Sequence, residues 1–411
     1  MAYRNTQTYR SVLPWTAMTG PFSRRQILGA TAALAAAPNP LPAAPRDFLK
    51  ELGVRPIING AGVYTFTTAS LMRPEVVEAI RSISTHFVRL DELHDAVGRR
   101  IAQLLGAPAA MVPSGAAAGL TLGTAAVLTG DDPERIRRIP DLTGMKSEVI
   151  VQKSHRFPYD HMVRNCGVRL IEVETREEFE RAINPRTAML LFLNKAEKAG
   201  KLGMEEFIAL GRKHAIPTMN DCAADVPPVE NLLRPIRLGF DMVVVSGGKA
   251  IRGPQSAGIL AGRADLIQAA RKNTAPNSDT IGRSCKVNKE EMVGMMVALE
   301  SFLKDDYASL YRGWERTAEE MKAALSRTPR VHAEIFVPQI ANQCPHVRVR
   351  WDGYTVSSEA LMQKLREGEP SIELVPAPSL PETIEIASWM LQPGDANIIT
   401  RRIREVLTKG A

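Results

Sequence analysis

The 411-residue sequence is poor in cysteine, lacks a long hydrophobic run, and has no acidic residue in its first 45 positions. Its four cysteines are widely spaced without a Cys-x-x-Cys pair, which excludes the usual zinc-ligand pattern and a disulfide-built fold. We expect mostly buried thiols. No apolar stretch is long enough to cross a bilayer, so no membrane span is expected. The composition is that of a soluble globular protein of about two domains.

The positive charge is concentrated near the N-terminus. The formal net charge is +7, and residues 1–45 carry four arginines and no acid, which leaves 7 − 4 = +3 for the remainder. A nearly balanced folded part gives no support for a nucleic-acid partner, and none is expected.

Residues 1–45 have the pattern of a twin-arginine export signal. Arg24 and Arg25 precede a mildly apolar stretch at residues 27–37 and a run of small residues and prolines. This predicts the Tat machinery as a partner and a periplasmic or secreted protein, with Met18 as an alternative start. The competing interpretation is a disordered Ala/Pro tail on a cytoplasmic protein. In either case, the fold is expected to begin after residue 45.

Apolar runs then alternate with helical patterns. Short β-branched or apolar runs predict strands at residues 110–112, 148–152, 168–173, 188–193, 217–220, 242–245 and 258–260. Helices are expected between them at residues 115–128, 159–165, 176–183, 204–214 and 229–238. This alternation predicts an α/β fold with a mostly parallel seven-stranded sheet covered by helices on both faces. Ligands of such sheets bind at the carboxyl ends of the strands.

The C-terminal part predicts a smaller α+β domain. Long helices are expected at residues 289–303 and 307–325, strands at 331–337, 346–351 and 372–375, and helices at 358–366 and 395–407. The predicted division is a leader and linker at 1–45, a large domain at 46–290 with an N-terminal arm at 46–75, and a small domain at 291–411.

Lys249 is the principal candidate catalytic residue. It follows the predicted strand 242–245 and is preceded by Gly247 and Gly248. Glycines at a strand end are typical of places where something approaches the backbone closely. A lysine there suits Schiff-base chemistry with an aldehyde cofactor. The alternative is a solvated lysine in a glycine-rich turn.

Three other strand ends carry residues that suit the same cofactor. Ser114 precedes a small-residue helix whose first amides predict a phosphate site, although Ser-Gly is also an ordinary cap. Asp221 suits a pyridinium nitrogen, with the small Ala223 against the ring, or a helix N-cap. His155 is the candidate for stacking on the ring, or else a hydrogen-bonded polar residue.

The order of these elements is the order expected of a pyridoxal-phosphate (PLP) enzyme of the aspartate-aminotransferase fold, type I. Residues 52–262 resemble the family that contains selenocysteine synthase and D-glucosaminate-6-phosphate ammonia-lyase. The motifs that carry the resemblance are residues 56–62, 74–79, 113–119, 154–161, 164–167, 246–249 and 253–255. The resemblance implies Lys249 as the internal-aldimine lysine, Asp221 on the ring nitrogen, a dimer or larger ring, and four residues near the phosphate: Ser114, Gly115, Ala116 and Ser246.

The expected reaction is an α,β-elimination on an amino acid or amino-sugar acid, in which Lys249 takes the α-proton. The lyase branch is preferred because the N-terminal tRNA-binding module of selenocysteine synthase is replaced here by a leader and short linker. An exported enzyme favours an unphosphorylated substrate. A selenium transferase, an aminotransferase, a racemase and a pseudoenzyme remain alternatives. Three arginines are candidates for the substrate carboxylate: Arg252, Arg348 and Arg350.

Overall fold

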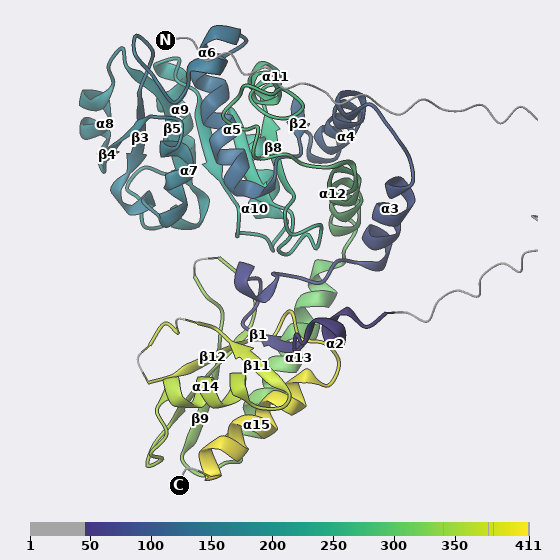
Figure 1. The fold of residues 1–411 in the computed structure, drawn as a ribbon. Helices are drawn as coiled ribbons and strands as arrows, with labels where there is room; N and C mark the ends of the chain where they lie inside the picture. Colours follow the sequence, from purple (N-terminus) through teal and green to yellow (C-terminus); the bar gives the residue numbers. More distant parts are fainter. Residues whose placement is uncertain (1–45, 340, 377, 381, 410–411) are drawn as a thin grey trace, which may run out of the picture. The chain divides into compact units, whose positions relative to one another are not determined.

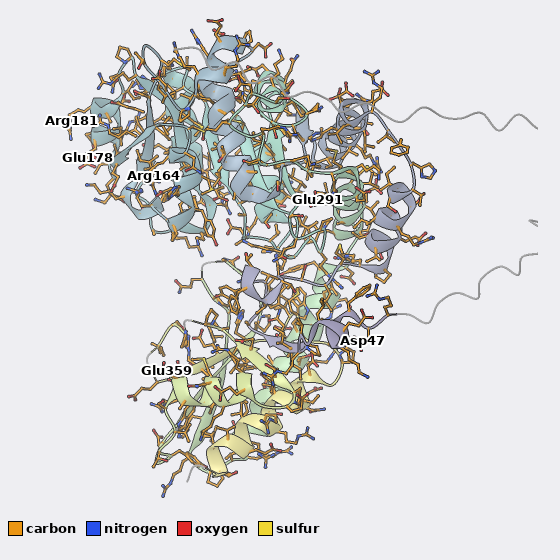
Figure 2. All side chains as sticks on the ribbon, viewed as in Figure 1. Asp47, Arg164, Glu178, Arg181, Glu291 and Glu359 are labelled. Atoms are coloured by element: carbon orange, nitrogen blue, oxygen red, sulfur yellow. The ribbon has the colours of Figure 1, made fainter. Side chains whose placement is uncertain are left out.

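The computed structural model describes residues 46–339, 341–376, 378–380 and 382–409, which form parts of two units, residues 1–55 and 56–411. In the first unit the described residues form helix α2 (Phe48–Leu52). Asp47, which is labelled in Figure 2, caps this helix. Its side chain accepts a hydrogen bond from the Lys50 amide at 3.1 Å. The predictions for residues 1–45 lie outside the described residues. Among the described helices, none combines the length and apolarity that a bilayer crossing requires.

A seven-stranded sheet organises the second unit (Figure 1). Its strands, in spatial order, are β2 (Ala109–Met111), β8 (Gly258–Gly262), β7 (Met242–Ser246), β6 (Thr218–Asp221), β5 (Thr187–Leu193), β3 (Glu148–Gln152) and β4 (Arg169–Val173). Strand β8 is antiparallel to both neighbours, and the other neighbouring pairs are parallel. The predicted mostly parallel sheet of seven strands is confirmed.

Helices cover both faces of this sheet (Figure 1). The helices of this part of the chain are α3 (Pro74–Ser84), α4 (Leu90–Leu105), α5 (Gly115–Thr129), α6 (Pro133–Arg138), α7 (His161–Arg164), α8 (Arg176–Ala182), α9 (Met204–Lys213), α10 (Glu230–Leu238), α11 (Ala264–Lys272) and α12 (Lys289–Phe302), of which α3 packs on α12 and α6 on α5. Successive residues of β5 show why both faces are covered. Leu190 and Phe192 belong to one apolar core, whereas Met189 and Leu191 belong to the other, and all four are fully buried.

The C-terminal part is a smaller domain with an antiparallel sheet in the order β12 (Ile384–Ala387), β10 (His346–Trp351) and β9 (Val331–Phe336). Helices α13 (Tyr307–Ser326), α14 (Ser358–Glu367) and α15 (Asp395–Lys409) share its apolar core. A further strand, β11 (Ser371–Leu374), pairs in parallel with β1 (Ile57–Gly60), which lies within the predicted N-terminal arm. The sequence patterns did not predict β1, β12 or helices α3, α4 and α11.

The register of the central strands aligns their carboxyl ends. Asp221, the last residue of β6, pairs with Leu193 at the end of β5 and with Val244 near the end of β7. Residues that follow these three strands therefore meet at one edge of the sheet.

Candidate active site

A cavity of about 190 Å³ lies at the carboxyl ends of β5, β6 and β7, beside the first turn of α5. We call it the cofactor cavity. Its lining residues are Thr65, Gly115, Ala116, Ala117, Leu120, Phe157, Tyr159, Leu193, Lys195, Asp221, Ala223, Ala224, Asp225, Ser246, Lys249 and Gln255. The fold thus brings together six predicted residues from three separate motifs: Gly115, Ala116, Asp221, Ala223, Ser246 and Lys249.

Lys249 lies on a loop that is held closely against neighbouring backbone. The Ser70 hydroxyl donates a hydrogen bond to the Gly248 carbonyl at 2.8 Å. A Cβ on Gly248 would lie 2.3 Å from the Cα of Gln255, so no side chain fits there. Glycine is therefore required by the packing of the loop on itself. Burial lowers the pKa of the Lys249 amine, and the nearby carboxylates of Asp221 and Asp225 oppose this shift.

Asp221 provides a buried carboxyl group at the end of β6. Its side chain is 3% exposed and accepts a hydrogen bond from the Ala223 amide at 2.8 Å. Burial raises the pKa of Asp221, and the positive charges of Lys249 and Lys195 act in the opposite direction. A cationic ring nitrogen would stabilise the charged form of this carboxyl further, so the site suits the predicted pyridinium partner.

The start of α5 presents hydrogen-bonding groups to the cavity, although the Gly115 amide already donates to the Pro113 carbonyl at 2.8 Å. Ser114 occupies the N-cap position, but its side chain makes no capping hydrogen bond, and Gly115 and Ala116 line the cavity. The helix start is held in place because the Gly258 amide donates to the Pro113 carbonyl at 3.0 Å. A Cβ on Gly258 would lie 2.7 Å from the carbonyl carbon of Gly115. The Ser114 hydroxyl and the helix amides that follow Gly115 fit a phosphate group.

His155 lies outside the cavity, which corrects the prediction that it stacks on the cofactor. Its side chain is fully buried, and its Nδ1 accepts a hydrogen bond from the Leu193 amide at 3.1 Å. Its ring packs edge-on against Phe192, and burial lowers the pKa of His155 to about 4. A neutral ring in the core instead supports the end of β5. The aromatic residues that line the cavity are Phe157 and Tyr159, from the same segment.

The three candidate arginines also lie outside the cofactor cavity. Arg252 lines a different pocket and donates to the Leu71 carbonyl at 2.8 Å. Arg348 forms ion pairs with Glu334 and Glu385 at 2.7 and 2.9 Å. Arg350 is exposed on β10. Their assignment to the substrate carboxylate is not supported, because the sequence pattern does not show which side chains the tertiary structure turns toward the cavity.

Two charged residues of the cavity were missed. Lys195 follows β5. Among the described residues that line the cavity, Lys195 and Lys249 are the two that carry a positive charge. Asp225 is 3% exposed, and its Oδ2 has no hydrogen-bond partner. Burial raises the pKa of Asp225 to about 7, and the charge of Asp221 adds to the shift. Applying the strand-end rule to β5 would have identified Lys195.

The fold and this site define a pyridoxal-phosphate-dependent enzyme of fold type I. Lys249, Asp221 and the start of α5 offer an amine, a carboxyl group and a phosphate cradle around one cavity, and these fit that cofactor. The model of the L-seryl-tRNA selenium transferase family matches residues 58–312, and the chain belongs to this family.

Individual relatives differ in how much of their length this chain matches. D-glucosaminate-6-phosphate ammonia lyase of Salmonella typhimurium is 28% identical over 89% of this chain and 99% of its own length. The L-seryl-tRNA(Sec) selenium transferase of Desulfotalea psychrophila is also 28% identical, but over 62% of this chain and 59% of its own length. A solved structure of D-glucosaminate-6-phosphate ammonia-lyase superimposes with a TM-score of 0.77 at 27% identity, covering 89% of this chain and 100% of the other.

Proposed function

We propose that this enzyme is an ammonia-lyase that eliminates a β-hydroxyl group from an amino acid or amino-sugar acid and releases ammonia and a keto acid. The observation that carries the proposal is the meeting of Lys249 and Asp221 in one cavity, in a chain similar to an ammonia-lyase over nearly its whole length. The selenium transferases are matched over a smaller share of their length, which favours the lyase.

Bound pyridoxal phosphate would supply an electron sink for the negative charge that develops at the substrate α-carbon. Lys249 is the residue that takes the α-proton at its Nζ. Burial lowers its pKa, which increases the fraction of neutral amine that can act as a base near neutral pH. Asp221 would hold the ring nitrogen and supply the negative charge that keeps it protonated.

Asp225 is positioned to assist departure of the hydroxyl group. Its carboxyl lines the cofactor cavity, and with a pKa raised by burial to about 7 it is partly protonated at neutral pH. A hydroxide ion is a poor leaving group, so a proton delivered from the unpartnered Oδ2 would let the group leave as water.

We also propose that the enzyme acts as a dimer or larger ring and is exported through the Tat machinery. Support for the oligomer comes from large apolar side chains that are exposed before and after helix α3: Leu71, Met72, Phe87 and Val88. Support for export comes from the paired arginines Arg24 and Arg25.

The test is a screen of β-hydroxy amino acids and amino-sugar acids for keto-acid release by purified enzyme. Wild-type protein should be yellow and release keto acid from at least one of them, and Lys249→Ala should do neither. A protein that stays colourless with added pyridoxal phosphate would indicate a pseudoenzyme. A gel shift with seryl-tRNA tests the transferase alternative, and we expect no complex.

A further inference from the structure

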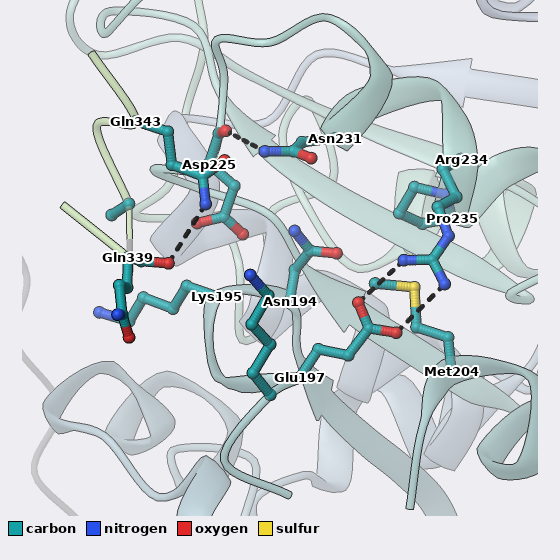
Figure 3. A pocket seen from close by; sticks show the side chains of 12 residues that line it. Asn194, Lys195, Glu197, Met204, Asp225, Asn231, Arg234, Pro235, Gln339 and Gln343 are labelled. Carbon is teal, nitrogen blue, oxygen red and sulfur yellow. Dashed lines mark hydrogen bonds and ion pairs between the residues drawn. The ribbon is translucent and has the colours of Figure 1, made fainter. Parts of the chain in front are cut away.

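A second cavity adjoins the cofactor cavity, and no role has yet been assigned to it. We call it the side cavity (Figure 3). Its lining residues are Asn194, Lys195, Glu197, Lys198, Met204, Asp225, Asn231, Arg234, Pro235, Gln339, Ala341 and Gln343. Lys195 and Asp225 line both cavities, so the two spaces meet at these side chains. Its volume of about 270 Å³ is many times the roughly 10–15 Å³ that one water molecule requires.

The cations of the side cavity are only partly neutralised. Arg234 is paired with Glu197 through two contacts at 2.8 and 3.2 Å (Figure 3). In contrast, Lys195 and Lys198 have no carboxylate within 4.0 Å in the described part of the chain. The remaining acid, Asp225, is partly neutral near pH 7 because burial raises its pKa. The cavity therefore has an excess of positive charge that suits an anion.

The other polar groups suit hydroxyl groups. Four side-chain amides line the cavity: Asn194, Asn231, Gln339 and Gln343. The Asn231 Nδ2 donates to the Asp225 carbonyl at 2.8 Å and the Gln343 Nε2 donates to the Gln339 carbonyl at 3.2 Å. Each of these two interactions uses the amide nitrogen and leaves the amide oxygen to accept from a ligand. The buried Asp225 Oδ2, which has no partner, is left to form a hydrogen bond with a ligand hydroxyl at the junction of the cavities.

We infer that the side cavity binds the distal chain of the substrate, a hydroxylated carbon chain that ends in an anionic group. This inference rests on the proposed function, which decides which end of the substrate lies in which cavity. Its reacting carbons lie in the cofactor cavity, and the chain passes Asp225 toward Lys195 and Lys198. The anionic end is a phosphate or a carboxylate, since both provide the acceptor oxygens that ammonium groups bind.

The first experiment measures binding without catalysis. Calorimetry with the holoenzyme uses 6-phosphogluconate, glucarate and gluconate, which lack an amino group and so cannot react. We expect one of the two anionic-ended acids to bind roughly tenfold more tightly than gluconate. Lys198→Glu should abolish that preference. Lys201→Glu is the matched control, because Lys201 is exposed on the same loop and lines neither cavity, and it should retain the preference.

The second experiment measures turnover of serine, D-glucosaminate and D-glucosaminate 6-phosphate. Lys198→Glu should lower kcat/KM roughly tenfold for a long, anionic-ended substrate, a larger loss than for serine, and Lys201→Glu should not. Equal binding of the three sugar acids, or equal effects of the two charge reversals, would overturn the inference. If no substrate releases keto acid while the binding preference and its loss in Lys198→Glu are observed, the proposed function fails and the anion site stands.

Discussion

Replacing Asp225 with asparagine tests the electrostatics on which the site depends. The Asp225 carboxyl has a side-chain hydrogen bond with Asn194. Asparagine has nearly the same shape and can keep that bond, but it cannot ionise. Burial and the neighbouring Asp221 raise the pKa of the Asp225 carboxyl from 3.8 to about 7. The folded protein therefore binds this proton more tightly than the unfolded chain between pH 4 and 7. The free energy of unfolding should fall as the pH rises through this interval and level off above about pH 7.

The magnitude follows from the displacement of the pKa. Raising it from 3.8 to about 7 corresponds to about 4 kcal/mol, at about 1.4 kcal/mol per pH unit. Because Asp225 is only 3% exposed, solvent screens little of this effect. The unfolding free energy of wild type, taken relative to that of Asp225→Asn, should be about 4 kcal/mol lower at pH 8 than at pH 4.

The assay is urea unfolding of the cofactor-free protein at a series of pH values, for wild type and Asp225→Asn. The exposed Asp279→Asn is the control, since it removes the same charge from the surface. Stability curves of wild type and Asp225→Asn that run parallel from pH 4 to 8 would refute the reasoning. The control should run parallel to wild type.

Three further substitutions test the cofactor cavity. Lys249→Ala should remove the yellow absorbance and lower turnover by at least roughly 100-fold, because the amine and the general base are lost; retained turnover would show that another base acts. Asp221→Asn should stay folded but lower kcat roughly 100-fold, since the buried charge is removed, and steady-state kinetics beside the exposed control Arg350→Ala check this. Gly258→Ala should weaken cofactor binding at least roughly fivefold, since a Cβ 2.7 Å from the carbonyl carbon of Gly115 displaces the start of α5. Unchanged affinity in a cofactor titration would mean that the helix start does not bind phosphate.

Much of the large domain could be predicted because its strands are fully buried. A run such as 242–245 must be apolar on both faces, so the pattern is visible without any knowledge of its neighbours. Strands β1 and β12 were missed; each pairs with a strand that does not neighbour it in the sequence, β1 with β11 and β12 with β10. Local propensity carries little information about such short pairings.

By itself, the sequence determined the class of sheet and the strand ends that carry Lys249 and Asp221, because burial and the carboxyl-end rule act on local patterns. Only the tertiary structure decided which polar side chains face the cavity. It buried His155 in the core. It also brought Lys195 and Asp225 to the junction of the two cavities. Orientation and ion pairing depend on residues far apart in the chain, and the glycines before Lys249 are required by the packing of its loop.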